Sequence, residues 1–431
     1  MFGWVRELNQ RERRTLLASS GGWALDALDV QVYSFVIPAL IVAWGISKGE
    51  AGLLGTSALL FSALGGWITG VLCDRYGRVR MLQITIVWFA VFTFASGFTN
   101  SFNQLFICRA LQGLGFGGEW AAGSVLMGEV IRAKYRGRAV GTVQASLHIG
   151  WGAAALLYTL FFTIMEPEVA WRAMFWIGIL PALFVVYIRR SIDEPEIFHQ
   201  TRAQTGNGNL LAKTIEIFSP VYLWRTTLCV LVATGVQGGY YALSIWLPTY
   251  LKTARDLSVL STGGYLLVLI VGAWCGCILG AHMSDAIGRR KTFFFFAVTA
   301  SAIAYVYTQL PLNNAMMLVL GFPLGFCSNG IFAPMGPFLT ELFPTRIRGT
   351  AQGFCFNAGR AVGALFPTLV GYLSDSMDLG HAIGVFAISA YALVVVAGFL
   401  LPETKGRDLT VEEPKHSDAP AASVPTETQV Q

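Results

Sequence analysis

Two carboxylates stand three residues apart in a segment that is otherwise apolar. Asp26 and Asp29 belong to the run LDALDVQVY, between LASSGGWA and SFVIPALIVAWGI. When two such groups are crowded together in a low-dielectric site, the pKa of one of them rises, because both cannot ionise at low cost. A carboxylate in this situation can bind and release a proton. On a helix, Asp26, Asp29 and Tyr33 would share one face, so the spacing indicates a proton-binding face.

Two more charges occupy another apolar segment. Arg109 opens the run RALQGLGFGG, and Glu119 follows directly after it. A charge deep inside a membrane helix costs several kcal/mol unless it is paired or hydrated. We therefore expect Asp26, Asp29, Arg109 and Glu119 to form one proton-coupling cluster. Asp29 is the first choice for the group that takes the proton, and Asp26 for the group that holds Arg109 or the neighbouring backbone. In the alternative, each carboxylate hydrogen-bonds to a neighbour and never titrates.

A second arginine, Arg360, lies in the apolar run FNAGRAVGALFP. No acidic residue stands three or four positions away, where a partner on the same helix would lie. An arginine without a local partner can bind a ligand carboxylate through two N–H groups. The sequence therefore predicts an anion site at Arg360. The alternative is a salt bridge across helices to Asp26, Asp29 or Glu119.

Aromatic and polar side chains in the apolar segments suit a small planar acid held between rings. The expected substrate-binding residues, besides Arg360, are Tyr33, Gln144, His148, Trp151, Gln237, Tyr240, Tyr241, Trp246, Asn329, Phe332, Phe356 and Asn357. Histidine titrates near neutral pH, so His148 could also assist proton movement or simply donate to a carbonyl. Many aromatic side chains in membrane helices only pack, and packing is the alternative for each of these.

Membrane-spanning helices must position these side chains. The chain has 431 residues, of which 54% are hydrophobic and 13% are charged, whereas a soluble domain carries about 25% charged residues. The apolar residues form blocks of roughly 20, the length of a helix that crosses a hydrocarbon core of about 30 Å. They lack the alternation of a membrane β-barrel. Twelve blocks are expected: 17–45, 51–73, 81–99, 103–131, 138–164, 170–189, 223–251, 262–284, 292–310, 314–342, 350–374 and 381–401.

The expected fold is an all-α membrane protein with twelve transmembrane helices in two pseudo-symmetric six-helix bundles. The expected divisions are an N-terminal six-helix bundle (1–189), a cytoplasmic linker (190–222), a C-terminal six-helix bundle (223–401) and a cytoplasmic tail (402–431). The tail is poor in large apolar residues, so we expect it to be disordered. Lys and Arg cluster in the loops on one side, and the positive-inside rule places both termini there, in the cytoplasm.

Composition and motifs also exclude several classes of function. Short loops beside the membrane account for the basic clusters, so we expect no nucleic-acid partner. The seven cysteines are scattered through apolar segments, without the spacing of a disulfide framework or a zinc site. No GxxxxGK[ST] motif occurs, and no nucleophile–base motif lies outside the bilayer. We therefore expect neither a metal nor a cofactor, and not an enzyme.

Three motifs of the first half recur in the second half at a nearly constant separation. The pairs are GVLCDRYGRVR (70–80) with AHMSDAIGRRK (281–291), RALQGLGFGG (109–118) with GFPLGFCSNG (321–330), and GEVIRAKYRG (128–137) with TELFPTRIRG (340–349). The repeat keeps carboxylates as well as bases. A carboxylate at a helix end can accept hydrogen bonds from the N-terminus of a helix in the other half, which predicts a latch on the cytoplasmic side.

The residues expected in this cytoplasmic gate are Asp74, Arg75, Arg78, Glu129, Arg136, Asp285, Arg289, Glu341 and Arg348. The latch would break when the cytoplasmic side opens. In the alternative, these basic loops only set the orientation of the chain in the membrane.

The D-R-x-G-R loop with its second copy, the run RALQGLGFGGEW and the closing PETKG (402–406) resemble the major facilitator superfamily over essentially the whole chain. WALDALD, GFGGEW and NAGRAVGALFP resemble the branch of aromatic-acid and sialate proton symporters, bacterial niacin transporters and animal organic-ion carriers. The resemblance implies a monomer in the cell (inner) membrane that works by alternating access around a central site. It associates the helix-4 arginine, Arg109, with proton coupling and the helix-11 arginine, Arg360, with anion binding.

We therefore expect proton-coupled symport of a small organic anion, such as nicotinate or benzoate. The expected partners are this anion, the proton and the lipid bilayer. The segment TVQASLHIGWGAAALL has no proline, unlike the Gly-Pro-rich helix of drug antiporters. One alternative is a uniporter or an organic-cation carrier that uses Asp26, Asp29 and Glu119 as cation sites. A second alternative is a membrane sensor that does not transport.

Overall fold

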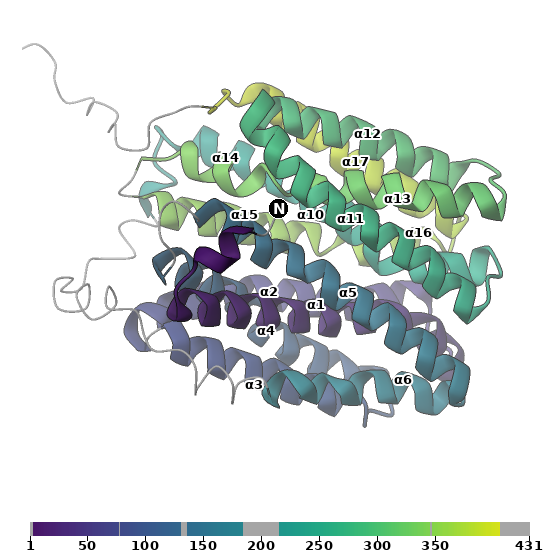
Figure 1. The fold of residues 1–431 in the computed structure, drawn as a ribbon. Coiled ribbons are helices and arrows are strands. Elements are labelled where there is room, and N and C mark those ends of the chain that lie inside the picture. Colours follow the sequence, from purple (N-terminus) through teal and green to yellow (C-terminus); the bar gives the residue numbers. More distant parts are fainter. Residues whose placement is uncertain (1–2, 77, 131–135, 184–214, 345–346, 406–431) are drawn as a thin grey trace, which may run out of the picture.

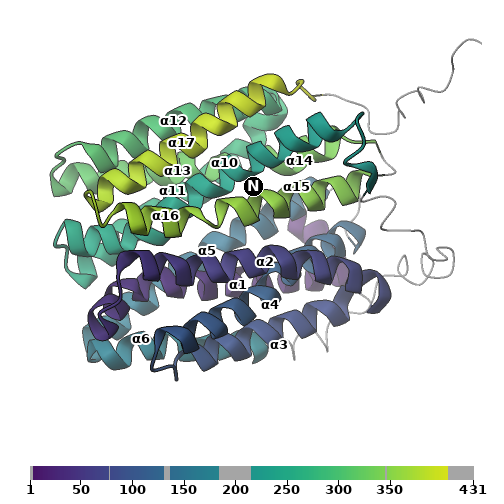
Figure 2. The same cartoon turned by 180° about the vertical axis from the view of Figure 1, so that it is seen from behind.

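A computed structural model describes residues 3–76, 78–130, 136–183, 215–344 and 347–405, and these form helices joined by short turns (Figures 1 and 2). For part of α2, α3, α4, α5 and α14 it describes the path of the helix and not the side chains. The first half contains η1 (Gly3–Glu7), α1 (Gln10–Trp44), α2 (Lys48–Tyr76), α3 (Arg78–Ser96), α4 (Phe102–Val130), α5 (Arg136–Ile164), α6 (Pro167–Trp176) and η3 (Ile177–Ile179). The second half contains α10 (Leu223–Thr249), η4 (Tyr250–Ala254), α11 (Val259–Ile287), α12 (Arg289–Gln309), α13 (Asn314–Gly330), α14 (Met335–Glu341), α15 (Arg348–Gly363), α16 (Phe366–Leu373) and α17 (Leu379–Leu400).

Each of the twelve predicted apolar blocks overlaps at least one of these helices, so the predicted all-helical fold is confirmed. Within the described residues, nine stretches are long and apolar enough to cross a membrane. The tenth block is divided between α13 and α14, and the eleventh between α15 and α16. Pro367 explains the second division, because proline donates no backbone hydrogen bond and its ring displaces the carbonyl four residues earlier.

The two halves form separate bundles that repeat the same pairings. In Figure 1 the purple-to-blue helices of the first half lie below the green-to-yellow helices of the second half. Helix α2 packs along α4 in the first bundle, as α11 packs along α13 in the second. A methyl group at Gly113 would overlap the carbonyl oxygen of Ala58, and one at Gly325 would overlap that of Leu269. The glycines of the sequence repeat therefore bring equivalent helix backbones into contact.

The bundles meet at the end of the molecule that we call the far end, where α2 begins and α16 finishes. Helix α2 packs against α16 there, and α5 packs against α11. Gly52 lies directly against the carbonyl of Pro367, with no space for a side chain. Thr56 donates a hydrogen bond of 2.5 Å to the carbonyl oxygen of Ala364, at the break between α15 and α16. The far end is therefore closed by backbone contacts and short polar side chains.

The opposite end, on the left of Figure 1, is called here the terminus end because it holds η1 and the end of α17. The segment before α1 is folded against its own bundle. Trp4 and Leu8 pack with Leu16 and Ala139 in a small apolar cluster. Arg13 donates to the carbonyl oxygen of Val5 at 3.1 Å. The N-terminal segment thereby ties the start of α1 to the start of α5.

Candidate functional site

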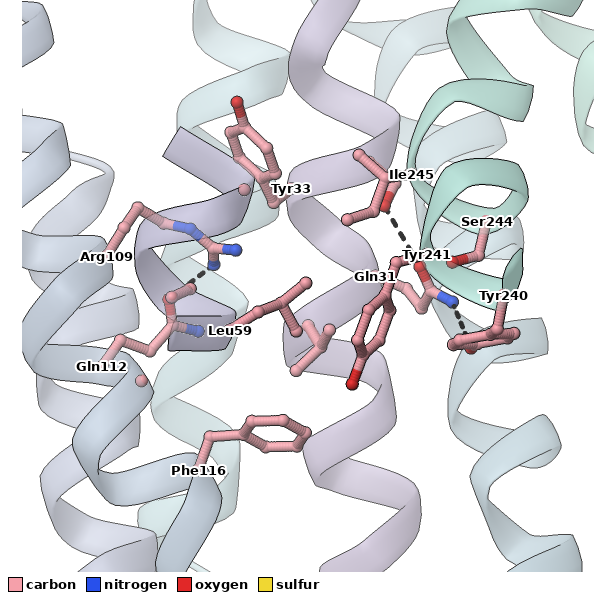
Figure 3. A pocket seen from close by; sticks show the side chains of 15 residues that line it. Gln31, Tyr33, Leu59, Arg109, Gln112, Phe116, Tyr240, Tyr241, Ser244 and Ile245 are labelled. Atoms are coloured by element: carbon pink, nitrogen blue, oxygen red, sulfur yellow. Dashed lines mark hydrogen bonds between the residues drawn. The ribbon is translucent and has the colours of Figure 1, made fainter. Parts of the chain in front are cut away.

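A small cavity lies between the two bundles, with walls from α1, α2, α4 and α10 (Figure 3). Its volume is about 30 Å³, which is enough for about two water molecules. The lining residues are Val30, Gln31, Tyr33, Ser34, Gly55, Ala58, Leu59, Arg109, Gln112, Gly113, Phe116, Tyr240, Tyr241, Ser244 and Ile245. This volume is too small for an organic molecule, and side chains of both bundles form the walls. An organic molecule could therefore occupy this position only after the bundles move apart.

A hydrogen-bonded chain of buried side chains runs from Arg109 to Asp29. The Nη1 atom of Arg109 donates to Gln112 Oε1 at 2.5 Å. Gln112 in turn donates through Nε2 to Asp29 Oδ2 at 2.7 Å. Thr93 of α3 donates to the same carboxylate oxygen at 2.5 Å. Helices α1, α3 and α4 are thus joined through one carboxylate oxygen.

Gln112 has a defined orientation in this chain, because its oxygen faces a cation and its amino group faces a carboxylate. Arg109 and Gln112 are three residues apart on α4, which places them on one face of the helix. The Arg109 guanidinium also lies over the ring of Tyr33, 4.5 Å from its centroid. Asp26 is buried one turn before Asp29 on α1, and both are 1% exposed. Protonation of Asp29 would weaken both hydrogen bonds that its oxygen accepts, and so change what holds Arg109.

Polar contacts across the two bundles surround Tyr240 of α10. Gln31 of α1 donates to its hydroxyl oxygen at 3.2 Å, and Ser34 donates to Gln31 at 3.2 Å. The Tyr240 ring meets Trp151 of α5 edge-on, at a centroid distance of 6.2 Å. It also meets Phe332, which follows α13, at 5.4 Å. One tyrosine therefore connects four parts of the molecule.

His148 of α5 lies across the bundle interface from Asn329 of α13. The His148 Nε2 atom is 3.3 Å from Asn329 Oδ1. The amino group of Asn329 donates to the carbonyl of Gly325 at 3.1 Å, so the amide oxygen is the atom that faces the histidine. The neutral imidazole has a single N–H group, and both this amide oxygen and the backbone carbonyl of Ala145 on α5 are acceptors for it.

Arg360 of α15 is held by aromatic rings. Its side chain is 4% exposed, and its Cζ atom lies 5.0 Å from the ring centroid of Phe356. Phe116 of α4, in the other bundle, lies 5.5 Å from the same atom. No described carboxylate forms an ion pair with Arg360, and its Nε atom has no hydrogen-bond partner in that part of the chain. The Arg360 guanidinium is also hydrogen-bonded to the neighbouring Tyr241 hydroxyl.

The structure brings some predicted site residues together and separates others. Tyr33, Arg109, Tyr240 and Tyr241 line the cavity, and Arg360 lies beside it. The remaining described candidates for proton coupling and substrate binding lie outside the cavity lining: Asp26, Asp29, Gln144, His148, Trp151, Gln237, Trp246, Asn329, Phe332, Phe356 and Asn357. The side chain of Glu119 is outside the described residues.

Three of these outlying candidates make structural hydrogen bonds within the second bundle. Gln237 donates to the carbonyl of Phe356 at 2.9 Å. Trp246 donates to the carbonyl of Pro367 at 2.9 Å. Asn357 donates to Gly353 on its own helix at 3.0 Å. The first two tie α10 to α15 and α16.

Sequence reasoning missed several residues of the cavity, among them Gln31, Gln112 and Phe116. A signal for two of them was present. Gln112 and Phe116 follow Arg109 by three and seven positions on α4, which places all three on one helix face. Gln31 had no comparable signal, because its partner Tyr240 is on a distant helix.

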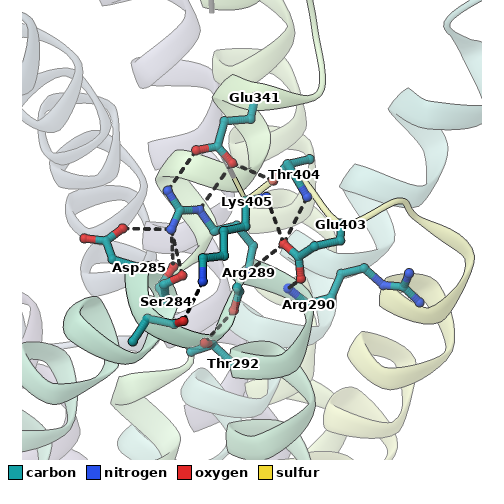
Figure 4. A network of polar contacts seen from close by, with 11 residues as sticks. Ser284, Asp285, Arg289, Arg290, Thr292, Glu341, Glu403, Thr404 and Lys405 are labelled. Carbon is teal, nitrogen blue, oxygen red and sulfur yellow. Dashed lines mark hydrogen bonds and ion pairs between the residues drawn. The ribbon is translucent and has the colours of Figure 1, made fainter. Parts of the chain in front are cut away.

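A second polar network occupies the terminus end of the second bundle (Figure 4). Arg289 forms ion pairs with Asp285 at 2.7 Å and with Glu341 at 2.9 Å. These contacts join α11, α12 and α14, all within one bundle, whereas the sequence analysis expected a carboxylate that reaches the other half. Arg348 donates to the carbonyl of Phe343 at 3.4 Å, also within this bundle. The other gate side chains lie outside the described residues: Asp74, Arg75, Arg78, Glu129 and Arg136.

Glu403, which follows α17, extends this network by capping α12. Its two carboxylate oxygens accept from the backbone N–H groups of Arg289 at 2.9 Å and Arg290 at 3.1 Å. Thr404 and Lys405 donate to it as well, at 3.0 and 3.1 Å. Burial acts to raise the pKa of the Glu403 carboxyl, but these backbone donors outweigh it and hold the pKa below its ordinary value. The segment after α17 is therefore fastened to the N-terminus of α12 by an ionised carboxylate.

Replacement of Glu403 by glutamine is expected to make stability less dependent on pH. A lowered pKa in the folded state means that the carboxylate stabilises the fold above the unfolded pKa, which is about 4.3. This stabilisation is lost as the pH falls through the lower, folded value. Because Glu403 is largely exposed, we expect the wild type in detergent to unfold only about 1–2 °C above Glu403→Gln at pH 7.

That difference should shrink as the pH is lowered to 4 and below. Glu166→Gln is the matched control, because Glu166 is exposed and precedes α6 without a capping hydrogen bond. A pH-independent difference for Glu403→Gln, or an equal effect of the control, would contradict the assignment of the cap. Thermal unfolding followed by tryptophan fluorescence is the measurement.

Comparison with known proteins identifies the family of this chain and proteins of similar fold. A sequence model described as Major Facilitator Superfamily matches residues 20–285, and one described as Sugar (and other) transporter matches residues 193–413. The chain is 41% identical to a probable 4-methylmuconolactone transporter of Cupriavidus pinatubonensis, over 99% of this chain and 98% of that protein. It is 30% identical to a cis,cis-muconate transport protein of Acinetobacter baylyi, over 88% and 92%. The xylose transporter XylE from E. coli, in an inward open conformation, has a similar fold, with a TM-score of 0.70, 20% identity and coverage of 91% and 97%.

Proposed function

Because the chain belongs to the major facilitator superfamily, and is thus a multi-pass membrane transporter of a metabolite and not an enzyme, we propose that it takes up a small organic anion together with protons. The proposed substrate is an aromatic or other monocarboxylate, such as nicotinate or benzoate. Transport would proceed by alternating access, in which the two bundles rock around the central cavity. The terminus end would face the cytoplasm, in the cell (inner) membrane.

Arg360 is the observation that carries the choice of an anion. It is a buried cation beside the cavity, and the described residues surround it with aromatic rings and the Tyr241 hydroxyl, not with a carboxylate. A buried guanidinium that is not neutralised by a carboxylate is a strong site for a carboxylate ligand, because the ligand supplies both the charge and the hydrogen-bond acceptors. Two similar proteins are described as carriers of 4-methylmuconolactone and of cis,cis-muconate, which supports an organic acid.

The hydrogen bonds that connect Arg109 through Gln112 to Asp29 support proton coupling. Asp29 is buried and accepts two hydrogen bonds at one oxygen, so its protonation changes the contacts of three helices. We propose that proton binding neutralises the Asp29 carboxylate while anion binding neutralises the Arg360 guanidinium, so that neither group remains as an isolated buried charge. The loaded site can then move between the two sides of the membrane at low electrostatic cost.

Asp26 and Asp29 favour one alternative, a carrier of organic cations or a uniporter. Both carboxylates are buried in the first bundle and could attract a cationic substrate. A sensor that does not transport has no observation of its own in its favour. Transport of a cation without a need for a proton gradient would distinguish this alternative from the proposed symport.

Uptake into proteoliposomes tests the proposed function. Labelled benzoate, nicotinate, muconate, sialate and a quaternary amine would each be supplied with and without an inward proton gradient. We expect at least one carboxylate to accumulate, and its accumulation to disappear when an ionophore collapses the gradient. Anion symport fails if only the amine moves, or if the collapsed gradient leaves accumulation intact. Movement of none of these compounds in liposomes with verified protein orientation would favour the sensor.

A further inference from the structure

We propose that Phe116 is a specificity-determining residue, whose ring selects planar, ring-bearing carboxylates over saturated ones. This assignment rests on the proposed anion site at Arg360 and adds the shape of the substrate to it. Phe116 belongs to α4 of the first bundle and lines the central cavity. Its ring centroid also lies 5.5 Å from the Arg360 guanidinium of the second bundle. The same side chain therefore borders both the cavity and the cation.

The backbone that carries Phe116 is fixed in place. Gly113 and Gly117 flank it on α4, and a methyl group at either position would overlap a carbonyl oxygen of α2, that of Ala58 or of Ser62. Helix α4 is thus held against α2 at backbone distance, and it cannot rotate without a clash. A ring mounted on this part of α4 has a constant position relative to the cavity, as a selective wall requires.

Tyr241 of α10 supplies a second aromatic wall, from the other bundle. It lines the same cavity, and in Figure 3 the rings of Phe116 and Tyr241 point toward one space from the two bundles. The Tyr241 hydroxyl donates to Gln237 Oε1 at 3.3 Å, which orients the ring. A planar acid that lies between these two rings would hold its carboxylate beside Arg360. Aromatic faces favour a flat π-system in such a position over a puckered aliphatic ring.

The chemistry of phenylalanine also suits the unloaded site. A carboxylate at position 116 would neutralise Arg360 and compete with the substrate. A phenyl ring stabilises the guanidinium only weakly, through its quadrupole. It leaves the charge for a ligand, together with the N–H groups that do not contact the Tyr241 hydroxyl. The contact between Phe116 and Arg360 joins the two bundles, so an arriving carboxylate would change an inter-bundle contact as it binds.

Two monocarboxylates of equal charge and similar size test this proposal, benzoate and cyclohexanecarboxylate. Binding would be measured by competition against the transported label in proteoliposomes. The wild type is expected to prefer benzoate. Phe116→Leu should lower the affinity for benzoate by about three- to tenfold and change the affinity for cyclohexanecarboxylate by less than about twofold. Phe116→Tyr, which keeps the ring, should restore the preference.

Phe106→Leu is the matched control, since Phe106 lies on the same helix and packs against Phe102, outside the cavity lining. We expect it to leave both affinities unchanged. An equal loss for both acids in Phe116→Leu, or an unchanged ratio, would overturn the role of Phe116. That result differs from failure of the proposed function, in which the wild type binds neither acid but transports the amine.

Discussion

Arg360→Ala is expected to reduce the affinity for the transported anion by about 30- to 4000-fold. Loss of one partner from a buried, hydrogen-bonded charge pair costs about 2–5 kcal/mol, and each 1.4 kcal/mol corresponds to about tenfold in a dissociation constant. Arg360 is 4% exposed, so water cannot replace the guanidinium cheaply. Arg360→Lys should retain part of the affinity, because the charge remains but the two-pronged hydrogen bonding is lost.

The measurement is the dissociation constant of benzoate, or of whichever carboxylate the wild type transports, in detergent and in proteoliposomes. Lys291→Ala is the control, because Lys291 is an exposed cation at the terminus end. Size-exclusion profiles would show whether each variant is folded. An unchanged affinity in folded Arg360→Ala would refute the anion site, whatever the effect on the rate of uptake.

Asp29→Asn is expected to abolish the proton-driven accumulation of the anion and to leave the exchange of labelled for unlabelled anion intact. Asparagine has nearly the same shape as aspartate and its oxygen can still accept from Thr93 and Gln112, so the links among α1, α3 and α4 can survive. It cannot take up or release a proton in the physiological range. We therefore expect accumulation against a gradient to fall to the equilibrium level, a loss of about tenfold or more for each pH unit of driving force. Counterflow of labelled for unlabelled anion should continue.

Asp256→Asn is the control for this prediction. Asp256 is exposed in the connection between η4 and α11 and has a positive φ of 50°, a conformation that asparagine also tolerates. Accumulation should be unchanged in this variant. If Asp29→Asn still concentrates the anion in response to a proton gradient, the proton is carried elsewhere, and Asp26 becomes the next residue to test.

Local spacing in the sequence was enough to predict the helices and the repeat. The apolar blocks are long, and the matched glycines Gly113 and Gly325 make equivalent close contacts with Ala58 and Leu269. These features depend on neighbours along the chain or on a motif that occurs twice. Both kinds of information are present in a single sequence.

The partners of the buried charges were not predictable in the same way. Arg109 and Asp29 are joined through Gln112, a residue that was not among the expected site residues. The ring beside Arg360 comes from Phe116, on a helix of the other bundle. Such contacts depend on the rotation and crossing of helices, which hydrophobic periodicity constrains only loosely.

The hydrogen bond between Thr56 and Ala364 closes the far end only four residues beyond Arg360. At 1.5 Å per helical residue, about 6 Å separates the proposed anion site from this contact along the chain. The Ala364 N–H group also donates to the Arg360 carbonyl at 2.8 Å, so one turn of backbone joins them rigidly. A signal that the site is occupied would therefore need no long allosteric pathway through the bundle. A change in the occupancy of the anion site would reach the contact that closes the far end through a single helical turn.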